Sequence, residues 1–207
     1  MTTFSHIQEI DLFIIKQANN FHRTIKFTAE ISEMEITFLD TIIFKGERFR
    51  NESILDIRTH YKPTETFQYT HFTSSHSPGV KKGFIKGEAL RLLRTNSSET
   101  AFNDSITNFK SRLTARSYPY KMIQTTLSEV TFAGRQSALQ QTGKARNQIL
   151  PFFTTYHPSV GNLKNILMLN WDLIQNQPLL KTIFKNPPIL SYRRGKSLTD
   201  MLVKAKL

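Results

Sequence analysis

The chain has 207 residues, and its 39% hydrophobic content with sixteen Phe is enough to build a core, which excludes a disordered chain on composition. It has no cysteine, which excludes disulfides and thiolate zinc sites. The formal net charge is +12. The first residues lack a signal-peptide pattern and no apolar run approaches the roughly 18 residues of a membrane span, so we expect an intracellular protein.

The positive charge is concentrated after residue 80. Residues 1–80 carry 8 basic and 10 acidic side chains, residues 81–146 carry 12 and 4, and residues 147–207 carry 8 and 2. A block of this kind suits a polyanion, and nucleic acid is the most common one. The alternative is a basic face that only solubilises the protein.

The first third of the chain predicts one helix and then three strands. Residues 5–22 have apolar side chains at helical spacing. The period then changes to two in residues 23–31, 35–44 and 54–61, with turn residues between them, which predicts an antiparallel meander. Asp40 in the second of these segments is a weak catalytic candidate, because acid catalysis and metal binding need converging partners.

Residues 62–79 are polar with prolines near both ends and predict an extended connector. Three short amphipathic helices are expected to follow over residues 83–132. The middle one has the clearest stripe, with an N-cap from Ser97 or Ser98 and apolar side chains at i, i+4, i+7 and i+11, namely Phe102, Ile106, Phe109 and Leu113. A compact trihelical unit is the shape of a helix-turn-helix domain, although many such bundles bind no DNA.

The remainder predicts a connector with mixed elements. Residues 134–148 are polar and read as a linker or an exposed helix, and residues 150–159 read as a strand. Residues 162–175 have helical spacing. A proline break, a basic YRRGK turn and a final amphipathic helix complete the chain.

No motif predicts chemistry. His71 and His76 lack the further ligands that a zinc site needs, and the neighbouring serines lack a nucleophile elbow, so local turn hydrogen bonds are their expected role. No Walker-A loop and no adjacent Asp-Asp pair is present. We therefore predict no catalytic residue, no metal, no cofactor and no small-molecule substrate, and no membrane partner.

The basic residues on or beside the trihelical unit are the best binding candidates, because Lys and Arg bind phosphate without reading sequence. They are Lys81, Lys82, Lys86, Arg91, Arg94, Arg112, Arg116 and Lys121. The expected partner is DNA or an RNA–DNA duplex. Tyr118 and Tyr120 could stack on bases or pack at a helix end.

Four blocks of the sequence, in order, resemble Penelope-like retroelement reverse transcriptases. They begin at "NNFHRTIKFTAEISEMEITFLDTIIFKG", continue with "THYKPTETFQYTHFTSSHSPGVKKGFIKGEALRLLRTNSSETAFNDSITNFKSRLTARSYP", and end with "LPFFTTYHPSVGNLKNILMLNW" and "PPILSYRRGKSLTDMLVKAKL". The second block also resembles the helix-turn-helix domain of many animal retroelement-derived proteins. Together the blocks cover roughly residues 20–207.

The resemblance implies a division into a palm-like remnant at 1–62, a thumb-like helix-turn-helix domain at 63–135 and a connector at 136–207. The family's Tyr-x-Asp-Asp motif would lie upstream of Asp11, and its GIY-YIG endonuclease beyond Leu207. The family's cysteine after its Arg-rich helix is replaced here by Thr95–Ser97, and its His-Pro is altered. No catalytic residue can be carried over, so the resemblance implies a non-catalytic fragment, with a missing palm or endonuclease as a further partner.

We therefore predict an α+β chain: a small antiparallel meander, a basic trihelical unit and a helical C-terminal segment. The predicted function is backbone binding of nucleic acid by a non-catalytic reverse transcriptase fragment. Three alternatives stay open: a free-standing sequence-specific DNA-binding protein, a subunit that works with a separate catalytic chain, and a decayed product with no function.

Overall fold

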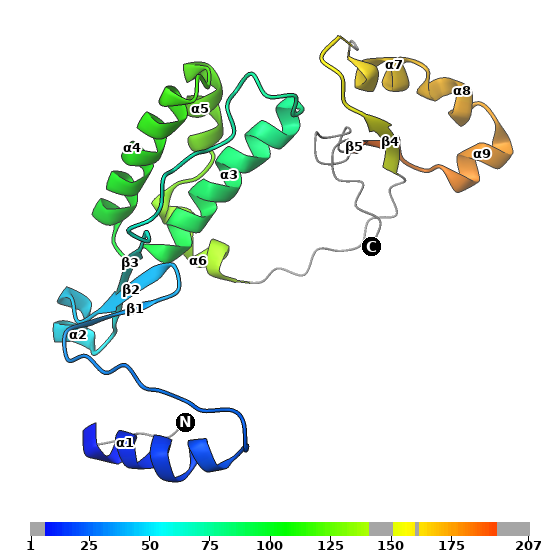
Figure 1. Cartoon of the computed structure of the whole chain (residues 1–207). Coiled ribbons are helices and arrows are strands. Elements are labelled where there is room, and N and C mark those ends of the chain that lie inside the picture. The colour runs from blue at the N-terminus through cyan, green and yellow to red at the C-terminus, as the bar shows by residue number, and fades with distance from the viewer. Residues whose placement is uncertain (1–6, 141–150, 160–161, 194–207) are drawn as a thin grey trace, which may run out of the picture. The chain divides into compact units, whose positions relative to one another are not determined.

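The computed structural model describes residues 7–140, 151–159 and 162–193 and has the predicted mixed α+β fold (Figure 1). The chain divides into two compact units. The first contains residues 1–67 and 91–108, and the second contains residues 68–90 and 109–207.

The N-terminal helix of the first unit is confirmed, but the strand predicted after it is wrong. Helix α1 spans Ile7–Lys16 and is followed by the 3-10 turn η1 at Ala18–Asn20. Residues 23–31 are exposed and form no strand. The Asn19 side-chain amide instead bonds both the N–H and the C=O of Phe27, at 2.5 and 3.1 Å. An alternating pattern predicts a strand only if a neighbour pairs with it.

The three-stranded antiparallel meander is confirmed with one strand assigned differently. Strands β1 (Glu35–Phe38), β2 (Thr41–Phe44) and β3 (Asp56–Thr59) pair in that order. The predicted single strand 35–44 is thus a hairpin, with Leu39 in its turn at a φ of 53°. A leucine rarely adopts this conformation, and neither Gly nor Asn stands in the turn, so Asp40 was its one turn-favouring residue and the signal was weak.

Helix α2 (Glu47–Glu52) connects β2 to β3 where the sequence predicted only a turn. The buried Asp56 at the start of β3 accepts hydrogen bonds from Arg48 Nε at 2.5 Å and Ser97 Oγ at 2.8 Å. Burial alone would raise the pKa of Asp56, but these bonds and the Arg48 charge outweigh it and hold that pKa below its ordinary value. A Cβ at Gly46 would collide with the Asp56 carboxylate, so a larger residue would have to displace this buried, hydrogen-bonded group.

The outer edge of β3 is covered by the turn between helices α3 (Pro78–Thr95) and α4 (Glu99–Ala115). The Ile57 and Ser97 backbones bond at 2.9 Å, and the Ile57 N–H donates to Ser97 Oγ at 3.0 Å. The Thr59 N–H donates to Oδ1 of the buried Asn96 at 3.2 Å. Residues 96–97 therefore satisfy the backbone groups of Ile57 and the N–H of Thr59 along this edge of β3.

The three predicted helices are confirmed, with α5 at Tyr120–Leu127. Helix α3 begins five residues before the predicted start, because Ser77 caps it and Pro78 occupies its first position. The Ser98 hydroxyl caps α4. The buried apolar side chains come mainly from these helices: Ile85, Ala89, Leu92, Leu93, Phe102, Phe109, Leu113, Tyr118, Ile123, Leu127 and Val130. Of the predicted stripe, only Ile106 is half-buried rather than buried.

Aromatic contacts in the second unit join the connector to the helices. The Tyr69 ring lies 5.2 Å from Phe84 of α3 and 5.6 Å from Phe109 of α4, measured between centroids. Phe72 meets Tyr118 at 5.5 Å. The Tyr69–Phe109 and Phe72–Tyr118 pairs are edge-to-face, a geometry that stabilises by about 0.5–1.5 kcal/mol beyond burial. The predicted extended connector is therefore held against α3 and α4 by its aromatic side chains.

The C-terminal segment contains a small parallel sheet that was only half predicted. Its elements are η2 (Phe132–Gly134), α6 (Arg135–Leu139), β4 (Pro151–Thr155), α7 (Leu163–Leu169), α8 (Trp171–Gln175), α9 (Pro178–Ile183) and β5 (Ile189–Arg193). Strand β4 was expected, whereas its parallel partner β5 was missed. The helix predicted at 162–175 is two helices, interrupted at Asn170. The predicted final helix and part of the 134–148 linker lie outside the described residues.

Among the described helices, none has the length and apolar character to cross a membrane.

We expect Asn96→Ala to lower the free energy of unfolding by about 1–3 kcal/mol, because the Thr59 N–H would lose its acceptor. Urea unfolding followed by circular dichroism measures this. Asn103→Ala on the exposed side of α4 is the control and should change stability by less than about 0.5 kcal/mol. Equal stability of the two variants would show that the turn does not hold the sheet edge.

Candidate nucleic-acid interface

One side of helix α3 combines two lysines with three glycines. Lys82 and Lys86 are exposed and lie one turn apart, and Gly79, Gly83 and Gly87 repeat at the same spacing. A Cβ placed on any of these glycines meets no heavy atom within 4 Å. Nothing inside the described protein therefore requires glycine here, although glycine in a helix interior costs about 0.5–1 kcal/mol relative to alanine. We call these five residues the α3 face.

The residue after the C-cap of α5 carries a charge that meets this face. Glu129 Oε2 lies 2.5 Å from Lys86 Nζ, and both side chains are about half exposed. The hydrogen bond and charge of Lys86 hold the pKa of Glu129 below its ordinary value, and the charge of Lys82 acts in the same direction. This contact joins α3 to the end of α5. Sequence reasoning missed it because the two residues are 43 positions apart.

The exposed side of α5 carries the polar residues expected of a DNA-reading helix, but most of them are engaged. Gln124 Nε2 donates to the Tyr120 hydroxyl at 2.6 Å. The hydroxyl of Thr125 donates to the Lys121 carbonyl at 2.8 Å, and that of Ser128 to the Thr125 carbonyl at 3.1 Å. The Lys121 ammonium is the exposed charge of this helix.

The comparison with protein families decides how the three helices are classified. A family model described as "Animal helix-turn-helix domain" matches residues 68–128. This segment is therefore similar to a helix-turn-helix domain. The match supports a DNA-binding role for the domain and falls inside the predicted segment 63–135. Neither the search of curated proteins nor that of solved structures found a match.

The eight predicted phosphate-binding residues differ widely in their surroundings. Lys81 is buried, with its Nζ donating to the Ser74 carbonyl at 2.9 Å and lying 4.8 Å from the centroid of the Phe72 ring. Its ammonium group therefore fastens the connector to α3. The helical period alone would have placed Lys81 on the buried side, near Ile85 and Leu92.

The predicted arginines lie mostly on the partly covered side of the helices. Arg91 approaches Asp40 Oδ2 at 3.6 Å and covers the Tyr61 ring at 5.6 Å. Arg112 and Arg116 are half-buried, while Arg94 is exposed. The arrangement thus brings Lys82 and Lys86 together on one face. The exposed Lys121 lies on a different helix.

The histidine and serine residues of the connector form local bonds, as the sequence suggested. His71 Nδ1 lies 2.9 Å from Thr73 Oγ1, and His76 Nδ1 lies 3.1 Å from Ser74 Oγ. Within the described ranges, no group of three or more His, Asp or Glu side chains converges on a possible metal position. These bonds shape the turn that leads into α3.

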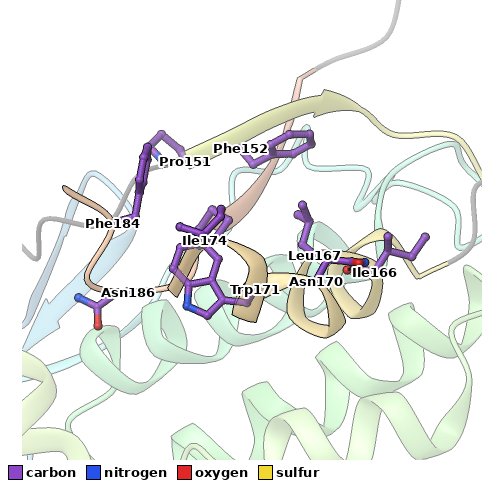
Figure 2. A pocket seen from close by; sticks show the side chains of 10 residues that line it. Pro151, Phe152, Ile166, Leu167, Asn170, Trp171, Ile174, Phe184 and Asn186 are labelled. Atoms are coloured by element: carbon purple, nitrogen blue, oxygen red, sulfur yellow. Dashed lines mark hydrogen bonds between the residues drawn. The ribbon is translucent and has the colours of Figure 1, made fainter. Parts of the chain in front are cut away.

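A separate pocket of about 460 Å³ lies in the C-terminal segment (Figure 2). Figure 2 shows Pro151 and Phe152 on the strand side and Trp171 and Ile174 on the helical side. Its lining is almost entirely apolar, with Asn170 and Asn186 among the few polar residues. Such a lining suits apolar groups rather than phosphate.

We expect Lys81→Gln to lower the free energy of unfolding by about 1–2 kcal/mol, because it removes a charged hydrogen bond and a cation–π contact. The matched change Lys82→Gln removes an exposed ammonium and should leave stability within about 0.5 kcal/mol. Thermal and urea unfolding of both variants measure the difference. If Lys82→Gln were the more destabilising change, the assignment of Lys81 to the protein interior would be wrong.

Proposed function

We propose that the protein binds duplex nucleic acid through the phosphate backbone with its helix-turn-helix domain. The observation that carries this proposal is the family match at residues 68–128 on a trihelical domain whose α3 face exposes Lys82 and Lys86. The domain lies in the positively charged part of a chain with a net charge of +12. Phosphate contacts by lysine supply affinity without base recognition.

The hydrogen bonds of α5 favour backbone binding over sequence reading. Direct readout needs several side chains whose donors and acceptors are free to meet base edges. Here Gln124 is bonded to Tyr120, and the hydroxyls of Thr125 and Ser128 are bonded to their own helix. The sequence-specific alternative would require these bonds to be exchanged for bonds to bases.

We further propose that the chain is a non-catalytic part of a retroelement reverse transcriptase, as the sequence resemblance implies. A supporting observation is the apolar surface of the N-terminal region, where Ile25, Phe27, Met34, Phe38 and Leu39 are 48–76% exposed. Exposed apolar residues in this number are typical of a surface that another protein segment covers. A subunit that works with a separate catalytic chain would expose such a surface. The proposal assigns no catalytic step to this chain.

We expect the purified protein to bind DNA duplex with an affinity that falls steeply with salt and depends little on base sequence. Fluorescence anisotropy between 50 and about 300 mM salt, with several unrelated duplexes, measures both properties. Lys82→Gln and Lys121→Gln together should make the log–log salt slope shallower by up to about two units, since each phosphate contact contributes about 0.9.

An RNA–DNA hybrid in the same titration separates the proposed roles. A polymerase-like backbone grip predicts similar affinity for the hybrid and for DNA, whereas a reader of the B-form major groove predicts a preference for one DNA sequence. Binding that does not change with salt, or no binding to any duplex, would contradict the proposed function.

We expect Gly83→Ala to raise the free energy of unfolding by about 0.5–1 kcal/mol, because alanine favours the helix and its Cβ meets no atom within 4 Å. The same change should weaken duplex binding if a phosphate backbone approaches the α3 face closely. Gly134→Ala is the control, since its Cβ also enters open space outside α3. If Gly83→Ala raised stability and left affinity unchanged, the duplex would not pack against this face.

A further inference from the structure

We infer that Glu129 competes with nucleic-acid phosphate for Lys86 and Lys82, so that duplex binding exchanges this carboxylate for a phosphate. The inference rests on the proposed duplex binding and assigns an autoinhibitory contact to the same surface. It starts from the ion pair between Glu129 Oε2 and Lys86 Nζ at 2.5 Å. An ammonium group binds a carboxylate and a phosphate through the same charge-assisted hydrogen bonds.

The contact is built so that an exchange is possible. The side chains of Lys86 and Glu129 are 48% and 54% exposed, so a phosphate can reach the lysine without any change in the core. An exposed ion pair of this kind contributes little to stability because water screens it, so breaking it costs the domain little. Lys82 lies one turn earlier on the same face, and its positive charge also favours the ionised form of Glu129.

Glu129 is held in position and does not belong to a loose tail. Leu127, two residues before it, and Val130, directly after it, are buried, and the Val130 N–H donates to the Leu127 carbonyl at 3.0 Å. The position itself is unfavourable for an acid, because the C-terminal end of a helix repels negative charge. Helix stability therefore does not account for a carboxylate here, whereas its contact with α3 does.

The sign of the effect follows from the charges. In the wild-type protein a phosphate must displace the carboxylate from Lys86 and then lies beside an unpaired negative charge. Glu129→Gln removes both the competition for Lys86 and the repulsion between carboxylate and phosphate. The affinity for duplex should therefore rise several-fold at low salt, and the salt slope should steepen by up to about one unit. The gain should shrink as salt screens the surface.

A matched charge change separates this contact from a general effect of net charge. Asp104→Asn removes an exposed carboxylate from α4 and changes net charge by the same amount. Fluorescence anisotropy with a DNA duplex should give less than a twofold change for this variant. Lys86→Gln should cause a small loss in the wild-type background and a larger loss in the Glu129→Gln background, which a double-mutant cycle measures.

The outcomes separate the inference from the proposed function. Wild-type binding with no gain in Glu129→Gln, or an equal gain in Asp104→Asn, overturns the inference and leaves duplex binding intact. An equal effect of Lys86→Gln in both backgrounds also overturns it. Absence of binding in the wild type and in Glu129→Gln overturns both, whereas binding in Glu129→Gln alone supports both. Circular dichroism of each variant verifies that it is folded.

Discussion

The hydrogen bonds between the α3–α4 turn and strand β3 are the constraint on which the first unit depends. A three-stranded sheet this small leaves two edges, and one of them is covered by Asn96 and Ser97. Asn96 is 1% exposed and also bonds the Thr59 hydroxyl and the Leu92 carbonyl, so each of its polar groups has a partner. A buried amide without those partners would destabilise the protein, which makes the pairing of this turn with β3 specific.

The sequence predicted the helices better than the strands, for a physical reason. A helix is stabilised by local bonds, so the stripe through Phe102, Phe109 and Leu113 and the cap at Ser98 were enough to locate α4. A strand depends on a distant partner. Residues 23–31 have the alternating pattern of a strand, but they pair with no strand in the described part of the chain. Strand β5 was missed because its partner β4 lies nearly 40 residues earlier in the sequence.

The candidate site was predictable in composition and not in detail. The cluster of basic residues and the trihelical shape follow from the sequence, and the family match supports the helix-turn-helix interpretation of that shape. Charge alone does not tell which lysine can reach a phosphate, because the adjacent residues Lys81 and Lys82 are buried and exposed, respectively. The Lys86–Glu129 contact depends on tertiary packing between α3 and the end of α5, for which no local pattern exists.

Two departures from local stability rules meet on the α3 face. Gly83 and Gly87 interrupt the interior of a helix without any internal contact that requires glycine, and Glu129 places a negative charge at the C-terminal end of a helix. Natural proteins tend to concentrate such departures where they function. The glycines leave the helix backbone open to a close approach, and the carboxylate is paired with Lys86, where we propose that a phosphate replaces it. A phosphate backbone has both the negative charge and the reach to do so, which makes this side of α3 the part of the domain best suited to nucleic acid.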